Sequence, residues 1–252
     1  MKALQYKKWK IFHHNEEATK QIIEEVFIDK IYDFVADNET PFIIDCGANV
    51  GISSLFFKEK YPHCEIVCFE PDPNAFAALT MNIEFNNLSN ITLINKALSS
   101  KDGEVDFYGH IYNSDPDSRG NSIVKAWGSR GGFSDKTTVL STRLYINKTV
   151  DFLKIDIEGA EFKVVSTAIN DIKKFVKKIC IEGHVFKHID KNQSCTDLLN
   201  LLSENGFECD VNFQNIDSFL PDYLNDWKKE ESPQIIIISG DNKMYSNNCE
   251  CL

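Results

Sequence analysis

The sequence predicts an α/β fold built on a doubly wound sheet, and three features of residues 41–71 lead to this prediction. An apolar run at residues 42–44 ends in Asp45, and a second run at residues 66–69 ends in Glu70. Between them lie a turn with two glycines and a stretch of helical periodicity. Strand, tight turn, helix and strand in this order form the first βαβ unit of such a sheet.

The glycine turn is suited to holding a ligand. Gly47 and Gly51 let the chain bend sharply and leave bare backbone where a Cβ would collide with a bound molecule. The open N–H groups of the following helix point into the same space. Glu70, at the carboxyl end of the neighbouring strand, can accept hydrogen bonds from both hydroxyls of a ribose. We therefore expect this unit to bind a nucleoside.

The spacing of the turn distinguishes between nucleoside cofactors. Dinucleotide-binding turns read G-x-G-x-x-G, whereas this turn reads D-x-G-x-x-x-G and begins with Asp45. An anionic aspartate would repel a pyrophosphate and attract a ligand that carries an ammonium and a sulfonium group, which favours S-adenosylmethionine over NAD. The simpler interpretation is a buried turn whose aspartate caps a helix. The residues expected to bind the cofactor from this unit are Asp45, Gly47, Asn49, Gly51, Glu70 and Pro71.

Length and composition limit the classes of function. The 252 residues suit one domain, with 1–40 as a helical extension, 41–185 as the core, 110–149 as an insertion or lid and 186–252 completing the sheet. The net charge of -11 argues against DNA or RNA as a substrate. No apolar stretch is long enough to span a bilayer, and the charged N-terminus does not resemble a signal peptide. We therefore expect a cytoplasmic protein with reduced cysteines.

The segments before the glycine turn differ in periodicity. Residues 1–14 are basic and irregular, and the adjacent His13 and His14 are expected at the surface. Residues 16–35 repeat apolar side chains at helical spacing. This pattern predicts an amphipathic helix on the sheet edge or over the mouth of the cofactor site.

A helix at residues 74–85 and a strand at residues 91–94 continue the sheet after the first unit. The carboxyl end of this strand should lie beside the adenine of the cofactor. Asn95 and Ala97, which follow the strand, are therefore expected to contact the base.

Four candidates for the chemistry stand at the ends of two later strands. Asp156 and Glu158 follow a buried run, and Glu182 and His184 close the next strand. Ligands bind at the carboxyl ends of strands in doubly wound sheets, so we expect these side chains beside the glycine turn. Glu161 opens the intervening helix and is expected only to complement its dipole.

The remaining stretches are less regular. A short strand at residues 104–108 precedes a polar, glycine-rich stretch at 110–136, which we interpret as a lid over the substrate. A helix at residues 196–205 leads to strands at 207–213 and 234–239. Because no full crossover helix is evident between the last two strands, they suggest an antiparallel edge.

With these residues identified, the chain resembles the FkbM-type S-adenosylmethionine-dependent methyltransferases over roughly residues 41–185. The resemblance rests on five segments, which read IDCGANVG (44–51), FEPDP (69–73), NKALS (95–99), LKIDIEGAE (153–161) and EGH (182–184). It implies a Rossmann-like class I methyltransferase with a seven-stranded, mostly parallel sheet, an antiparallel final strand and helices on both faces. It also implies that a hydroxyl of a sugar, glycan or natural product is methylated. Asp156, which follows the carboxyl end of its strand, is in addition expected to contact the cofactor.

Two routes for the acceptor proton follow. His184 can act as general base, with Glu182, Asp156 or Glu158 orienting the imidazole or the acceptor. A divalent ion held by Asp156, Glu158 and Glu182 could instead acidify the hydroxyl. The sequence does not separate these routes; we favour the first, because no compact metal motif is present, and Cys249 and Cys251 form an isolated C-x-C.

Two other functions remain open at this point. An aminopropyltransferase uses the same fold with a decarboxylated relative of the cofactor, and a non-catalytic module could retain cofactor binding. The expected partners are a small-molecule or glycan acceptor, with association into a homo-oligomer left open.

Overall fold

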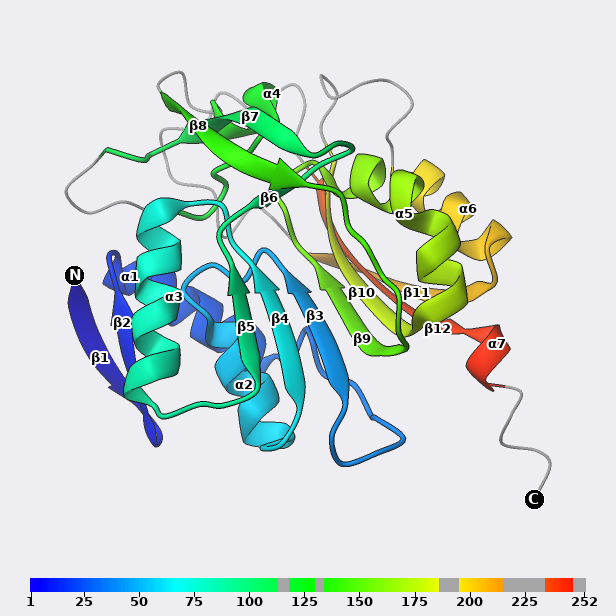
Figure 1. Cartoon of the computed structure of the whole chain (residues 1–252), viewed down its shortest axis with the longest axis horizontal. Helices are drawn as coiled ribbons and strands as arrows, with labels where there is room; N and C mark the ends of the chain where they lie inside the picture. Colours follow the sequence, from blue (N-terminus) through cyan, green and yellow to red (C-terminus); the bar gives the residue numbers. More distant parts are fainter. Residues whose placement is uncertain (113–117, 130–133, 186–194, 215–233, 247–252) are drawn as a thin grey trace.

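A seven-stranded sheet forms the centre of the computed structural model, which describes residues 1–112, 118–129, 134–185, 195–214 and 234–246 (Figure 1). Its strands are β3 (Phe42–Cys46), β4 (Glu65–Phe69), β5 (Ile91–Ile94), β9 (Val150–Ile155), β10 (Val176–Val185), β11 (Phe207–Gln214) and β12 (Gln234–Asn242). In space they run in the order β11-β12-β10-β9-β3-β4-β5. All neighbours pair in parallel except β12, which is antiparallel to both β10 and β11. The mostly parallel sheet with a reversed last strand is confirmed.

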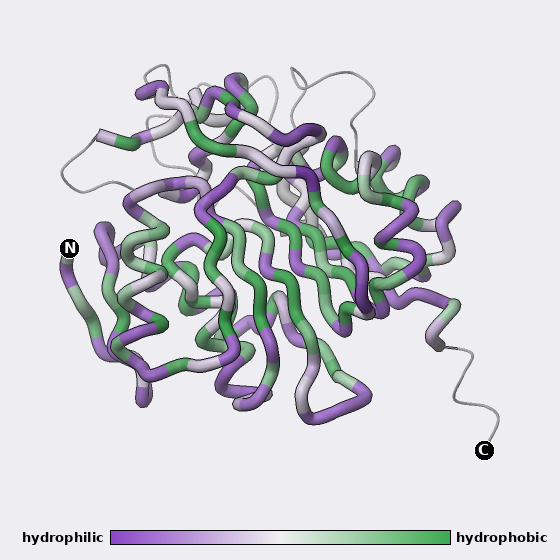
Figure 2. The backbone as a smooth tube through the Cα atoms, in the orientation of Figure 1, coloured by the Kyte–Doolittle hydropathy of each residue, from purple (hydrophilic) through white to green (hydrophobic). Residues whose placement is uncertain are grey.

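Helices cover both faces of this sheet, as expected (Figure 1). The three helices within residues 16–85 share one apolar core with Ile43 and Phe152. The two helices within residues 161–204 share a second core with Ile44 and Leu153. Successive side chains of a strand point to opposite faces, so neighbouring residues serve different cores. Figure 2 shows the central strands as largely hydrophobic segments joined by polar connections. The helices are α1 (Glu16–Ile23), α2 (Ile52–Lys60), α3 (Pro73–Phe85), α4 (Lys125–Gly128), α5 (Glu161–Phe175), α6 (Cys195–Glu204) and α7 (Lys243–Ser246).

A second, three-stranded sheet lies beyond the carboxyl ends of the central strands (Figure 1). It consists of β6 (Ala97–Leu98), β7 (Gly103–Gly109) and β8 (Asp135–Thr142), in the order β6-β8-β7. The polar stretch at 110–136 therefore begins just after one strand of this sheet and ends within another. The sequence did not predict β8, because six of its eight residues are polar and its two apolar residues, Val139 and Leu140, are adjacent and give no alternating pattern.

The first 14 residues are more regular than expected. They form an antiparallel hairpin of β1 (Lys2–Tyr6) and β2 (Trp9–His13) that packs on α3. Trp9, Ile11 and His13 are buried and alternate with less buried residues. The surface position predicted for His13 is therefore wrong, since its side chain belongs to the inner face of the hairpin.

The helix predicted at residues 16–35 ends early. α1 passes into a π-helical segment, η1 (Glu24–Ile28), and Lys30 then adopts a φ of 57°, a conformation that does not continue a helix. The chain that follows carries Tyr32 back to the sheet, where its side chain is buried. The last strand extends beyond its expected end at residue 239, to Asn242.

Some expectations fall outside the described residues. These are residues 113–117 and 130–133 of the lid and the tail cysteines Cys249 and Cys251. Cys46, Cys64, Cys68, Cys180 and Cys209 are free thiols. Among the described helices, none combines the length and the apolar character needed to cross a membrane. The division into extension, core and insertion stays a prediction.

Asn82 connects the hairpin to the glycine turn. This fully buried side chain accepts a hydrogen bond from the Phe12 N–H at 2.6 Å and donates to the carbonyls of Phe12 at 3.0 Å and Val50 at 2.7 Å. One residue of α3 thus fixes the hairpin and the turn relative to each other.

We expect Asn82→Ala to lower the free energy of unfolding by about 3 kcal/mol, because each buried polar group left without a partner costs about 1–3 kcal/mol. Urea denaturation followed by circular dichroism measures the change. Asn212→Ala is the control, since Asn212 is exposed on β11 and should change stability by less than about 0.5 kcal/mol. Equal effects of the two substitutions would contradict this role of Asn82.

Candidate functional site

The glycine turn packs tightly against the neighbouring strand. Gly47 and Gly51 have φ values of 84° and 91°, which favour glycine. A Cβ on Gly47 would lie 1.7 Å from the carbonyl oxygen of Asp156, and one on Gly51 would lie 2.6 Å from Leu79 Cδ1. Packing within the protein therefore requires glycine at both positions, in addition to the ligand contact predicted from the sequence.

Asp45 lies beneath this turn and is fully buried. Its Oδ2 accepts hydrogen bonds from Ser53 at 2.6 Å and Ser54 at 3.2 Å, both in the first turn of α2. Its Oδ1 has no hydrogen-bond partner among the described residues but lies 3.3 Å from Lys154 Nζ. The carboxylate that we expected to attract a cationic ligand thus has a counter-charge inside the protein, and its contact with a cofactor stays a prediction.

Lys154 lies at the centre of these contacts. The side chain is 2% exposed, and its Nζ donates to the carbonyl of Gly47 at 2.6 Å and lies 3.4 Å from Asp156. Burial lowers the pKa of Lys154, but the carboxylates of Asp45 and Asp156 outweigh it and raise the pKa above its ordinary value. Lys154 therefore remains charged and ties the turn to two strands.

Glu70 is held where a ribose was expected. Its Oε2 accepts a hydrogen bond from the Asn49 N–H and its Oε1 from the Asp72 N–H, both at 2.8 Å. Burial, together with the neighbouring Asp72, raises the pKa of Glu70 to about 8. Each oxygen keeps a lone pair for a further donor, so the residue fits a ligand that brings two hydroxyls.

The other cofactor candidates lie around Glu70. Asn95 donates to the carbonyls of Glu70 at 2.8 Å and Pro71 at 3.3 Å, and so braces the end of β4. Ala97 is buried in β6, opposite Ser141 of β8. The contacts of Asn95 and Ala97 with a base stay predictions.

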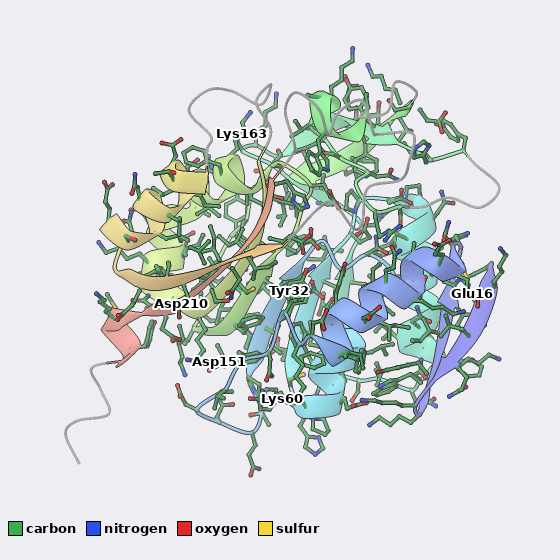
Figure 3. The ribbon with its side chains drawn as sticks, turned by 180° about the vertical axis from the view of Figure 1, so that it is seen from behind. Glu16, Tyr32, Lys60, Asp151, Lys163 and Asp210 are labelled. Carbon is green, nitrogen blue, oxygen red and sulfur yellow. The ribbon has the colours of Figure 1, made fainter. Side chains whose placement is uncertain are left out.

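The four residues predicted for the chemistry come together at the carboxyl ends of β9 and β10. His184 Nε2 lies 3.3 Å from Glu158 Oε2 and 3.6 Å from Glu182 Oε1. Tyr32, labelled in Figure 3, places its hydroxyl 2.9 Å from Glu182 and 3.2 Å from Asp156. Burial raises the pKa values of Asp156 and Glu182, and the repulsion from Asp156 helps to bring that of Glu182 to about 8.

The imidazole of His184 has a fixed orientation. Its Nδ1 lies 3.0 Å from Glu161, whose carboxylate also accepts the N–H groups of Ile157 and Gly159. Burial lowers the pKa of His184, but the negative charges of Glu158 and Glu161 raise it to about 10. Glu161 therefore positions the imidazole, a role beyond the helix-dipole effect expected for it.

Residues 118–129, within the expected insertion, lie against this cluster. The Gly120 N–H donates to Glu158 Oε1 at 2.9 Å and the Trp127 indole to Glu158 Oε2 at 2.5 Å. The indole ring also contacts His184 edge-on, with 4.9 Å between ring centroids. Asn49 of the glycine turn donates to Ser118 at 3.0 Å, so the same segment reaches both halves of the site.

Sequence reasoning missed Lys154, Tyr32, Trp127 and the positioning role of Glu161. Lys154 did carry a signal, because a lysine in the middle of the apolar run VDFLKI is buried only when it is paired. Tyr32 and Trp127 carried no such signal. Tyr32 lies in irregular chain and Trp127 in the short helix α4, and the positions of both segments depend on the tertiary fold.

Comparison with known proteins places this geometry among methyltransferases. A family profile described as "Methyltransferase FkbM domain" matches residues 45–209. "Methyltransferase sdnD" of Sordaria araneosa is 29% identical over 189 residues, which cover 64% of this chain and 73% of that protein. "2-O-methyltransferase NoeI" of Sinorhizobium fredii is 26% identical over 147 residues, 50% of this chain and 56% of that protein.

A solved structure of a methyltransferase FkbM from Methylobacillus flagellatus shares the fold. It superposes with a TM-score of 0.52 at 16% identity, over 81% of this chain. This chain spans only 45% of that longer chain.

We expect Lys154→Met to lower the free energy of unfolding by about 3–5 kcal/mol, because it leaves buried carboxylates without their counter-charge. Chemical denaturation of the cofactor-free protein measures the loss. Combining it with Asp45→Asn should restore part of the stability. Lys148→Met serves as control, since Lys148 pairs with Glu65 at the surface and should change stability by less than about 1 kcal/mol.

Proposed function

The chain belongs to the FkbM methyltransferase family and is an S-adenosylmethionine-dependent methyltransferase, and on this basis we propose that it methylates a hydroxyl oxygen of a sugar or natural-product acceptor. Family membership decides against the aminopropyltransferase and the non-catalytic module that the sequence had left open. The proposal for oxygen as the acceptor atom is supported by the relative whose name specifies 2-O-methylation.

The cluster of Asp156, Glu158, Glu182 and His184 is the observation that carries this proposal. An alcohol is a poor nucleophile until its proton can leave. A base positioned to accept this proton raises the reaction rate by about 10²–10⁴-fold. The four side chains offer such a base close to the glycine turn. Because its pKa is about 10, the imidazole of His184 already carries a proton at neutral pH. It can take the acceptor proton only after a further positive charge at the cluster has lowered this pKa and displaced the proton it holds.

The residues around the glycine turn fit the cofactor. S-adenosylmethionine supplies an electrophilic methyl group on a sulfonium. We propose that Glu70 accepts the ribose hydroxyls, since both of its oxygens are held by backbone N–H groups and its pKa is raised by burial. Asn49 and Gly47 would contact the cofactor beside Glu70, and Asn95 and Pro71 would support Glu70 from the end of β4. Asp45 would act indirectly, through Lys154.

The acceptor is proposed from the surroundings of the cluster. The net charge of -11 opposes a polyanionic acceptor. Carboxylates accept hydrogen bonds from hydroxyl groups, and the Trp127 indole beside Glu158 adds an apolar surface, so the surroundings of the cluster suit a neutral, hydroxyl-rich molecule. These features support a sugar or a hydroxylated natural product of small size.

We expect the protein to release S-adenosylhomocysteine when it is incubated with S-adenosylmethionine and a panel of nucleotide sugars, free glycans and hydroxylated natural products. In the responding reaction, His184→Ala should lower kcat by about 10²–10⁴-fold. Its affinity for S-adenosylhomocysteine, measured by calorimetry, should change by only a few fold, since the ribose site lies elsewhere.

The control for this experiment is His63→Ala, because His63 is exposed in the loop before β4. It should behave as wild type. Unchanged turnover of His184→Ala would remove His184 from the mechanism, and methylation of nitrogen or carbon in the product would refute an oxygen acceptor.

Glu70 generates a pH dependence of cofactor binding. Its pKa lies near 8 without ligand, and two hydroxyl donors favour the ionised carboxylate. We expect the affinity for S-adenosylhomocysteine to rise with pH up to about pH 8, by at most about tenfold per pH unit, and then to level off. Glu70→Gln should bind more weakly and lose this part of the slope. Parallel slopes for both proteins would contradict the role of Glu70.

A further inference from the structure

Three of the clustered side chains have the arrangement of a cation site. Asp156, Glu158 and His184 each offer one ligand atom, and these three atoms lie within 4.8 Å of one another. An ion with bonds of about 2.1 Å holds its ligand atoms at most about 4.2 Å apart. Small side-chain rotations are therefore enough to bring the three atoms around one ion.

The imidazole is oriented as metal-binding imidazoles usually are. A histidine that ligates a metal through one ring nitrogen typically donates the other ring N–H to a carboxylate. His184 Nδ1 faces the buried Glu161, and the carboxylate of Glu161 is itself held by two backbone N–H groups. This leaves Nε2 directed at Glu158 and Glu182. The side chain of His184 is only 2% exposed.

The acids also have supporting contacts. Glu158 accepts hydrogen bonds from Gly120 and Trp127, and Asp156 lies 3.4 Å from Lys154 Nζ. Lys154 is shared with Asp45, so it does not balance Asp156, Glu158 and Glu182 together. The cluster thus combines more carboxyl groups than neighbouring cations with ligand atoms whose positions are fixed by the surrounding protein.

From this geometry we propose that Asp156, Glu158 and His184 bind a divalent cation of the Mg²⁺ and Mn²⁺ class, with Glu182 beside it. Carboxylates suit Mg²⁺, Ca²⁺ or Mn²⁺, whereas imidazole suits transition metals, so a mixed set of two carboxylates and one imidazole favours Mn²⁺, the transition metal among the ions that carboxylates suit. The inference rests on the proposed function but changes the role of His184: with Nε2 bound to the ion, the imidazole is no longer free to act as general base, and the ion would acidify the acceptor hydroxyl instead. It differs from the ion site considered from the sequence, because His184 replaces Glu182 as a ligand.

Mn²⁺ itself is the probe. Protein stripped with EDTA and desalted is titrated with Mn²⁺, and free Mn²⁺ is followed by electron paramagnetic resonance. We expect one ion per chain, bound at least about tenfold more weakly by Glu158→Gln and by Asp156→Asn. Glu161→Gln should weaken binding by about 10–100-fold without removing a ligand. Asp241→Asn, which removes an equal charge from an exposed residue, should bind as wild type.

The outcomes separate this inference from the proposed function. Calorimetry with S-adenosylhomocysteine and circular dichroism on the same samples report cofactor binding and folding. A folded wild-type protein that binds S-adenosylhomocysteine but no Mn²⁺, or a folded Glu158→Gln that binds Mn²⁺ equally well, overturns the cation site and leaves the methyltransferase proposal intact. Full methyl transfer in EDTA overturns the role of the ion in the reaction.

Discussion

The buried contact of Lys154 with Asp45 and Asp156 is the interaction on which the site depends. It joins the ends of β3 and β9, and the additional bond from Lys154 to the Gly47 carbonyl fixes the turn between β3 and α2. Isolated charges are too costly to bury, so these three groups are stable only together. The two halves of the site, the residues around Glu70 and the cluster around His184, are therefore positioned by one cation that is itself inaccessible to a ligand.

A second constraint is the accumulation of acids beyond this contact. Glu70, Asp156 and Glu182 all have raised pKa values, because burial and neighbouring carboxylates disfavour their ionised forms. A folded protein that binds protons more tightly than the unfolded chain loses stability as the pH rises through those values. A ligand that brings positive charge or hydroxyl donors stabilises the ionised carboxylates and so restores part of the lost stability. The stability of the protein and the occupancy of the site are coupled for this reason.

Much of the fold followed from the sequence, because its signals are local. Apolar runs that end in Asp45, Glu70 and Asp156 identify central strands, and glycines at positive φ mark the turn. The hairpin at the N-terminus was missed, since its basic residues hid a two-residue alternation that includes His13. Strand β8 has little apolar character, so its pairing with β7 depends on tertiary context that no local pattern records.

For the site, the sequence identified which residues meet but not how they act on one another. Asp45 and Glu161 illustrate the difference, since Asp45 was assigned by its place before the glycine turn and Glu161 by its place at the start of a helix. In the structure Asp45 pairs with a lysine 109 residues further along the chain, and Glu161 with a histidine on the next strand. Such pairs depend on distances across the sheet, which the one-dimensional pattern does not contain. The ends of the strands predict which edge of the sheet carries the acidic side chains. Which cations pair with these acids can be derived only once the positions of the strands relative to one another are known.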